Sequence, residues 1–307
     1  MKTLALSLAC LSLAACGSTS GTGTLAMAAS GEEAAVEGYP SSTGIAFSDG
    51  WAIEWDFILV SLDAFYVHHG GSGPTLETDP VVVDLHDQLV QDVWTFPGLP
   101  AQRYEDVGYQ ILPPVASARR IGTVTDAQVQ SMMASGASLW LHGTASHADH
   151  ADVLLDLQIP MHTSMSDCEN AVDMTSGLIV SANGRSELQM TFHLDHFFFD
   201  SIVAEEPDLR FEAYAAAAGA DGTVTFDDLA AQQLADLHDI DGSPLMEGGM
   251  QVVYDPGSTP LATQDLRSFV YHQATTVGHF NGEGHCTYVC LDASGAVQPS
   301  CPAPALR

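Results

Sequence analysis

The stretch WAIEWDFILVSLDAFYVHH, residues 51–69, decides the fold class. In its first half apolar and polar side chains alternate, so Glu54 and Asp56 lie on one face of an extended chain and the apolar residues on the other. From Ile58 onward both faces are apolar, which predicts a strand that is buried on both sides or bulged midway. The sequence GGSGP at 70–74 then ends this strand.

Further stretches along the chain have the composition of strands, and short strands separated by turn residues are typical of an antiparallel β-sandwich. A glycine-rich phosphate loop and a regular alternation of strands with helices are absent from the sequence, which disfavours a nucleotide-binding α/β fold. We therefore expect a mainly β protein, an antiparallel β-sandwich with a few inserted helices. The further strands are expected at 81–86, 104–111, 138–145, 153–159 and 187–199.

Two helices are expected to interrupt this pattern. The first opens at the capping box Thr125-x-x-Gln128 and stops before Gly136. The second covers 264–275, with Thr263 as the residue that caps its first turn.

The composition is that of a folded, strongly acidic protein. Of 307 residues, 46% are hydrophobic and only 15% are charged, so the chain can bury a substantial core. The 39 Asp and Glu residues outnumber eight Lys and Arg residues, and the formal net charge is −31. A field of this sign repels nucleic acid and anionic lipid headgroups, so both are excluded as partners that bind through general electrostatics.

The N-terminus resembles a bacterial lipoprotein signal. Lys2 precedes an apolar run at 4–15, which is too short to cross a membrane as a helix, and the run ends in Leu-Ala-Ala-Cys at 13–16. The resemblance implies that residues 1–15 are removed and that Cys16 carries the lipid. An ordinary secretory signal, cut near Ala15 or Ala29, is the alternative.

The predicted lipid anchor implies a cellular location and a division of the chain into a tether and a folded body. Gly17, where an Asp would retain the protein at the inner membrane, points to an outer-membrane lipoprotein that faces the periplasm or the cell surface. The membrane is then a partner only through the anchor. Residues 16–43 are rich in Ser, Thr, Gly, Ala and Glu without a period, which predicts a flexible tether before a folded body at 44–307.

Four cysteines remain in the predicted mature body: Cys168, Cys286, Cys290 and Cys301. An even number in an exported protein indicates two disulfides, which would pin the C-terminal segment. Four cysteines allow three pairings, of which we favour Cys290–Cys301 together with Cys168–Cys286. A zinc site built from Cys286, Cys290 and His285 is the less favoured alternative.

Thirteen histidines in an acidic exported protein point to a transition metal, because imidazole is a common ligand of copper and zinc. His193 and His196 form an H-x-x-H pair within the predicted strand 187–199. On a strand, residues three apart point to opposite faces, so this pair cannot hold one ion unless the strand ends or bulges there. His193 is then expected beside Asp195, and His196 in the core.

Two sets of histidines are candidate metal ligands. Four donors at the predicted hairpin tip HADHAD, 147–152, lie on a single turn, although a solvated turn is the more ordinary interpretation. A glycine-rich segment, GHFNGEGHC at 278–286, carries two further histidines. We predict a copper or zinc site where the sandwich brings together His142, His193, His279 and His285.

The segment 209–237 resembles an EF-hand, a helix-loop-helix motif, within a helical insertion at about 200–240. Aligning its glycine with Gly222 places Asp221, Thr225 and Asp228 at calcium-ligand positions. Acidic residues are missing from the first and third positions of the loop. The segment is therefore interpreted as a degenerate hand, and a calcium-stabilised surface or adhesion module is the alternative function.

Catalytic signatures are few. The motifs G-x-S-x-G, H-E-x-x-H and S-x-x-K do not occur, and the thiols are expected to be oxidised. We therefore expect a protein that binds its metal without catalysis. A hydrolase that acts on carbohydrate or peptide is a second alternative.

The order of features in 45–115 carries a family resemblance. DGWAIEWDFILVSLDAFYV, VVVDLHD and FPGLPAQRYEDVGYQI follow one another, as in the prealbumin-like β-sandwiches of secreted bacterial proteins. The segment is also loosely similar to periplasmic copper-binding proteins of the methanobactin-associated type, and the whole chain to acidic lipoproteins of myxobacteria. The resemblance implies an exported copper-binding sandwich. No copper ligand is transferred, because no ligand motif matches residue by residue.

Overall fold

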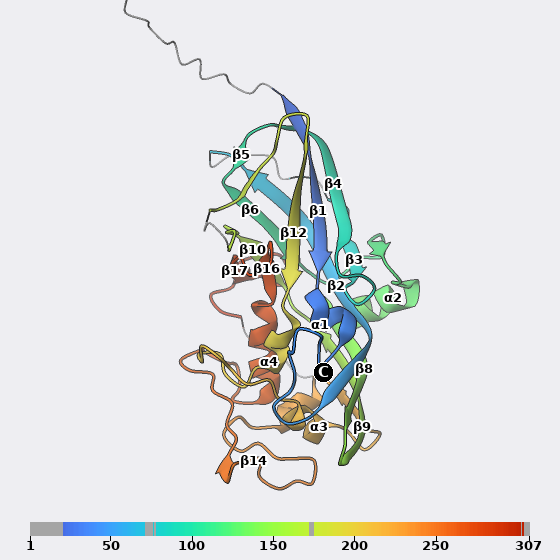
Figure 1. Ribbon diagram of the computed structural model, residues 1–307, viewed down its shortest axis with the longest axis vertical. Coiled ribbons are helices and arrows are strands. Elements are labelled where there is room, and N and C mark those ends of the chain that lie inside the picture. The colour runs from blue at the N-terminus through green and yellow to red at the C-terminus, as the bar shows by residue number, and fades with distance from the viewer. Residues whose placement is uncertain (1–20, 71–75, 77, 172–174, 302, 304–307) are drawn as a thin grey trace, which may run out of the picture.

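The computed structural model describes residues 21–70, 76, 78–171, 175–301 and 303. The fold is mainly β, as predicted, and two sheets share one hydrophobic core. Figure 1 shows β12, β1 and β4 side by side in front of β2 and β6. The smaller sheet has the order β16-β12-β1-β4, with bounds Gly278–Phe280, Arg185–Phe192, Thr22–Ser30 and Gln91–Pro100.

The larger sheet has nine strands in the order β13-β9-β8-β2-β6-β10-β17, with β3 paired to β2 and β7 paired to β3. Its strands are β2 (Ala52–His68), β3 (Val81–Asp84), β6 (Asp106–Ile111), β7 (Arg119–Ile121), β8 (Leu139–His147), β9 (His150–Ile159), β10 (Thr163–Ser166), β13 (Thr223–Thr225) and β17 (Thr287–Cys290). The short pairs are β5 (Arg103–Tyr104) with β11 (Leu178–Ile179), and β14 (Met246–Glu247) with β15 (Met250–Gln251).

The strand β2 confirms both features predicted for it. It is buried on both faces from Ile58 to Leu62. Its pairing with β8 shifts register between Trp55 and Phe57, which is the bulge. Three strand pairs depart from the predicted antiparallel pairing: β1 with β12, β9 with β13 and β3 with β7 are parallel.

The predicted tether is wrong over most of its length. Residues 1–20, with the predicted signal, Cys16 and Gly17, lie outside the described residues, but Thr22–Ser30 form β1 at the centre of the smaller sheet. Leu25 and Met27 are fully buried there. Helix α1 (Glu32–Glu37) follows directly. The sequence did not predict this strand, because Ala and Ser have little strand propensity. The strand forms through pairing with β4 and β12.

Replacing Leu25 with alanine is expected to lower the free energy of unfolding by about 3 kcal/mol, because a fully buried side chain leaves a cavity. Urea unfolding measures the loss. Thr22→Ala, at an exposed position of the same strand, is the matched control and should change stability by less than about 0.5 kcal/mol. Equal and small effects of both substitutions would restore the tether interpretation.

The helices agree with the sequence in part. Helix α2 (Asp126–Ser135) has the capping box of Thr125 and Gln128, and it ends at Gly136 in a left-handed conformation. Helix α4 (Leu266–Thr275) begins two residues later than predicted, because Asp265 and not Thr263 accepts the capping hydrogen bond from the Ser268 amide. In the described part of the chain, no helix is long and apolar enough to cross a membrane.

The EF-hand-like segment is not a helix-loop-helix. Helix α3 (Glu212–Ala217) has six residues, and the second helix is replaced by the four-residue 3-10 helix η2 (Asp228–Ala231). The loop strand β13 pairs in parallel with β9 of the large sheet and not with a neighbouring loop. Apart from these short elements, the insertion predicted at 200–240 is largely irregular. It is held by the pairing of β13 with β9, whereas an EF-hand loop pairs with the loop of a second EF-hand.

Candidate metal centre

The end of β12 brings two histidines to one place. The strand stops at Phe192, and His193 opens the 3-10 helix η1 (Leu194–Phe198), where the prediction continued the strand to 199. The tight turn reverses the opposite-face relation of a strand, so His196 comes back beside His193, with ring centroids 5.7 Å apart. The condition under which the H-x-x-H pair could converge, a strand that ends there, is therefore met. His196 is hydrogen-bonded, as expected for a core histidine, but it is only partly buried.

A third imidazole comes from the neighbouring strand. In β16, His279 lies opposite Thr191 of β12, and the His193 amide donates to the Val277 carbonyl at 3.0 Å. The ring centroid of His279 is 4.1 Å from that of His193 and 5.3 Å from that of His196. Antiparallel pairing of two segments more than 80 residues apart in the sequence thus assembles the cluster.

We call His193, His196 and His279 the histidine triad. One ring nitrogen from each lies within 4.8 Å of the others, a spacing at which three imidazoles can share one ion. His193 and His279 are each 7% exposed, and His196 is partly buried. The only other such grouping among the residues that the structure describes is Glu32, His193 and Glu283, which shares His193.

The hydrogen bonds of His196 fix which of its nitrogens can bind a metal. The Thr276 hydroxyl donates its single proton to the Gln273 carbonyl at 2.8 Å, and it lies 3.0 Å from His196 Nδ1. Since the hydroxyl proton is already used, His196 Nδ1 must donate to that oxygen. His196 Nε2 then carries a free lone pair, and the Thr276 contact orients the ring as metal-binding histidines require.

The most unusual atom of the triad is His279 Nδ1. It is buried and has no hydrogen-bond partner within the described part of the chain. A buried nitrogen without a partner costs about 1–3 kcal/mol, and a bound ion or water would supply the missing partner. His193 differs, since its Nε2 lies 3.4 Å from the Gly282 carbonyl and its Nδ1 lies 3.9 Å from Glu283 Oε2.

The environment keeps two of these imidazoles neutral. Burial, together with smaller contributions from the neighbouring His193, His196 and His285, lowers the pKa of His279 to about 3, and a hydrogen bond with the Thr276 backbone opposes this shift. Burial lowers the pKa of His196 to about 4, again with contributions from His193 and His285. Neutral imidazole is the form that binds metals, so both rings are in the ligand state at neutral pH.

These pKa values predict how the metal-free protein responds to acid. In the unfolded chain His196 and His279 titrate near 6.5, above their folded values, so the unfolded state binds more protons below that pH. Their contribution to stability is complete above pH 6.5 and is lost as the pH falls toward 4. At pH 5 the loss is expected to be about 1–2 kcal/mol per histidine.

Urea unfolding of the metal-free protein at pH 7.5, 6 and 5 measures this loss. The double variant His196→Gln with His279→Gln should lose less stability over the same range. A decrease of the same size in the variant and the wild type would show that other groups cause it.

Three carboxyl groups lie near His193 of the triad: those of Glu32, Asp195 and Glu283. Burial raises the pKa of Glu32 and of Asp195, and the nearby His193 opposes both shifts. Asp195 is thus near His193, as the sequence predicted. Glu32 has a φ of 58°, a left-handed conformation that is uncommon for a residue with a side chain, at the first position of α1. No signal in the sequence pointed to Glu32, because its segment was interpreted as a tether.

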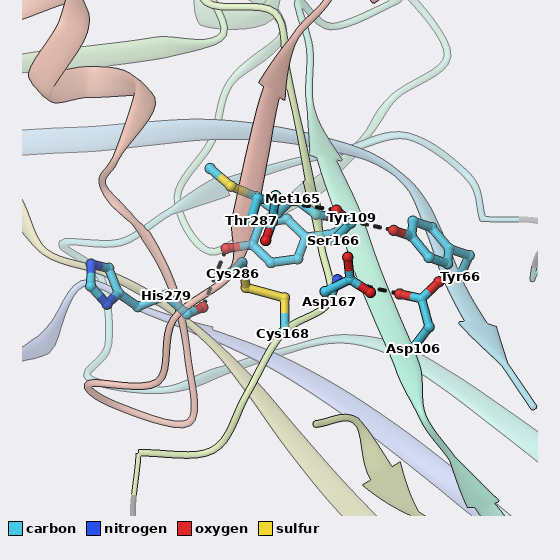
Figure 2. Close-up of a disulfide and its surroundings, with 10 residues drawn as sticks. All are labelled: Tyr66, Asp106, Tyr109, Met165, Ser166, Asp167, Cys168, His279, Cys286 and Thr287. Carbon is cyan, nitrogen blue, oxygen red and sulfur yellow. Dashed lines mark hydrogen bonds between the residues drawn. A yellow bond between two sulfur atoms is a disulfide. The ribbon is translucent and has the colours of Figure 1, made fainter. Parts of the chain in front are cut away.

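The loop that follows His279 is held by covalent and steric constraints. The disulfide Cys168–Cys286 joins its end to a residue two positions after β10, and the Tyr109 hydroxyl donates to the His279 carbonyl at 3.2 Å (Figure 2). A Cβ on Gly284 would lie 2.1 Å from the Phe280 carbonyl oxygen, so only glycine fits this turn. The second disulfide is Cys290–Cys301, so the favoured pairing is confirmed.

The structure separates the four histidines predicted as one site. His193 and His279 lie in the triad, and exposed His285 lies beside it, with its ring centroid 5.5 Å from that of His279. His142 does not belong to it. Its ring stacks on Phe57 at 4.8 Å and its Nδ1 lies 3.0 Å from Asp56 Oδ2, within the larger sheet. The prediction of His142 as a ligand is therefore wrong, because β8 pairs with β2 on the other sheet.

In the EF-hand-like loop and at the hairpin tip, the predicted metal ligands form hydrogen bonds with nearby residues. The Asp228 carboxylate accepts from the Thr225 amide at 2.9 Å and from its hydroxyl at 2.5 Å, and Asp221 accepts from the Thr223 amide. In the described ranges neither these residues nor the tip at 147–152 form a three-ligand group. The tip does form the predicted hairpin between β8 and β9, where His147 and His150 pack on Trp51.

Comparison of the chain with models of protein families, with curated proteins and with solved structures finds no match.

Proposed function

We propose that this protein binds one copper or zinc ion at the histidine triad and does so as a lipid-anchored protein outside the cytoplasm. The observation that carries the proposal is the buried, unpartnered Nδ1 of His279 among two other imidazoles. An ion bound through that nitrogen would satisfy it. Three imidazole ligands suit Cu(II) and Zn(II), whereas Ca²⁺ and Mg²⁺ prefer oxygen ligands.

The ligand set favours copper over zinc in intrinsic affinity. Divalent first-row metals follow a general order in which Cu(II) binds nitrogen sites more tightly than Zn(II). Two of the three rings are kept neutral by burial, so protons compete weakly with the ion. Both ions are therefore expected to bind, copper more tightly, and the chemistry of the site requires no catalytic step.

The membrane anchor is a separate part of the proposal. It is supported by the apolar run and the Leu-Ala-Ala-Cys sequence at 13–16, and by the two disulfides, which form in oxidising compartments. Mass spectrometry of the protein expressed from its full reading frame in a Gram-negative host tests it: acyl chains on Cys16 are expected. An unmodified N-terminus at another residue would overturn the anchor and leave the metal site unaffected.

Metal retention tests the site. The protein, purified without a histidine tag and stripped with chelator, is dialysed against Cu(II) or Zn(II) and then against metal-free buffer. One ion per chain is expected to remain, and a hundredfold excess of free metal over Kd should stabilise the fold by about 2.7 kcal/mol. Retention of neither ion, with no shift in the melting temperature, would overturn the proposal.

A further inference from the structure

A second group of metal-ligating side chains lies next to the triad and shares His193 with it. Glu32, His193 and Glu283 each place one ligand atom within 4.8 Å of the other two. They come from the first position of α1, the residue after β12 and the loop that follows β16. We call these three residues the carboxylate group. Since they are far apart in the sequence, the fold and not a local turn brings them together.

His193 is the member of the carboxylate group that points to a ligand. It is 7% exposed, and its Nε2 lies 3.4 Å from the Gly282 carbonyl. A carbonyl can only accept, so Nε2 carries the proton of the neutral ring and Nδ1 carries the lone pair. In the described part of the chain Nδ1 forms no hydrogen bond, and Glu283 Oε2 lies 3.9 Å from it. Two acceptors that face each other in this way need a proton or a cation between them.

The charge around His193 favours a divalent cation. Glu32 is repelled by three further carboxyl groups, those of Glu33, Asp195 and Glu283, and no Lys or Arg is among the groups that act on it most strongly. Within the described residues, neither Glu32 nor Glu283 forms an ion pair with Lys or Arg. Carboxylates that converge without such a partner repel one another, and a divalent ion removes that repulsion.

The carboxylate group and the triad are alternative positions of one ion. A neutral imidazole has one lone pair, so His193 binds a single ion at a time. The carboxylate group is the more exposed position, because the Glu283 side chain is 75% exposed and His279 is buried. It is also the weaker position for copper or zinc, since imidazole suits these ions better than carboxylate does. An ion from solvent therefore meets the carboxylate group first and gains affinity when it moves to the triad.

We propose that the carboxylate group is the entry site for the ion of the triad, and this inference rests on the metal site proposed above. A Cu(II) or Zn(II) ion first binds Glu32, His193 and Glu283. It then moves inward with His193 bound throughout, as His196 and His279 replace the two carboxylates one at a time. Release follows the same steps in reverse. An entry site on the path sets how fast the ion binds and leaves, and it has little effect on the affinity, because the start and the end of the path are the same.

The double variant Glu32→Gln with Glu283→Gln tests the entry site, because glutamine keeps the shape of glutamate and removes its charge. Stopped-flow mixing of the metal-free protein with Cu(II) gives the association rate constant. Capture of released copper by saturating EDTA gives the dissociation rate constant. Both are expected to fall about tenfold, the lower end of the range by which local charge raises association rates. Kd is their ratio and should change by less than about threefold, the effect of two nearby charges in water.

The fall in the dissociation rate constant is the decisive result. Carboxylates that only attract the ion from a distance, or that bind it in its final position, cannot slow its release when they are removed. Slower association with unchanged or faster dissociation would therefore overturn the entry site. Unchanged rate constants would show that the ion reaches the triad by another route, which would equally overturn it.

Glu54→Gln with Glu187→Gln is the matched control. It removes the same charge from exposed positions of β2 and β12, and both rate constants should stay as in the wild type. The single variant Glu283→Gln changes an exposed side chain, which the fold should tolerate, and it should slow both steps by a smaller factor. A wild-type protein that retains no ion after dialysis overturns the triad and the entry site together. A wild type that retains one ion, with a double variant whose release is not slowed, overturns the entry site alone.

Discussion

Replacing His279 with alanine is expected to weaken Cu(II) and Zn(II) binding at least about a hundredfold, so that no ion survives dialysis. Loss of a residue that merely orients a metal ligand typically costs 10- to 100-fold in affinity, and loss of a ligand costs more. His279 is at the centre of the triad, closest to His193 and also near His196. Competition with a chromophoric chelator measures the affinity.

Two histidines outside the triad serve as matched controls. His142→Ala removes a predicted ligand that the structure places on the other sheet, next to Asp56. His272→Ala removes a partly buried imidazole from α4. Both should bind metal as the wild type does. Equal losses in His279→Ala and His142→Ala would indicate adventitious binding by surface imidazoles, and an unchanged affinity in His279→Ala would contradict the triad.

Replacing Cys168 and Cys286 together with serine is expected to lower the free energy of unfolding by about 4–5 kcal/mol. This disulfide joins residues 118 positions apart, and the stabilisation by a cross-link grows with the length of the closed loop. The control is the double replacement of Cys290 and Cys301, which are separated by 11 positions. That change should cost about 2–3 kcal/mol. Urea unfolding without reductant gives both values.

The same variant also tests what holds the metal loop. The disulfide fixes the end of the segment that contains His279 and His285, so its loss should weaken metal binding as well as stability. Loss of Cys290–Cys301 should leave the affinity for metal nearly unchanged. A smaller stability loss for Cys168–Cys286 than for Cys290–Cys301 would contradict the loop-length argument, and unchanged metal affinity would contradict the role of the disulfide in the site.

The fold class was predictable because the strands of the large sheet carry their own signal. Residues 51–69 alternate and then become apolar on both faces, and the structure has β2 there with a bulge at the transition. The strand β1 was not predictable in this way. Its Ala- and Ser-rich sequence resembles a linker, and it is a strand only because β4 and β12 pair with it on both sides.

The sequence predicted that histidines form the candidate site, but it identified only some of the histidines that do so. Histidine abundance pointed to imidazole ligands, and His193 and His279 were among those chosen. His196 was assigned to the core because a continued strand would turn it away, and one short 3-10 helix reversed that geometry. The sequence alone could not exclude His142 as a ligand. The pairing of β8 with β2 depends on contacts between residues far apart in the chain.

Crystals of the Zn(II)-loaded protein, measured for anomalous scattering at the zinc edge, test the central claim most directly. The account predicts one strong peak per chain, bound by nitrogens of His193, His196 and His279 at about 2.0–2.1 Å. A strong peak elsewhere, for example between His147 and His150 at the hairpin tip, or no peak at the triad at saturating zinc, would contradict it.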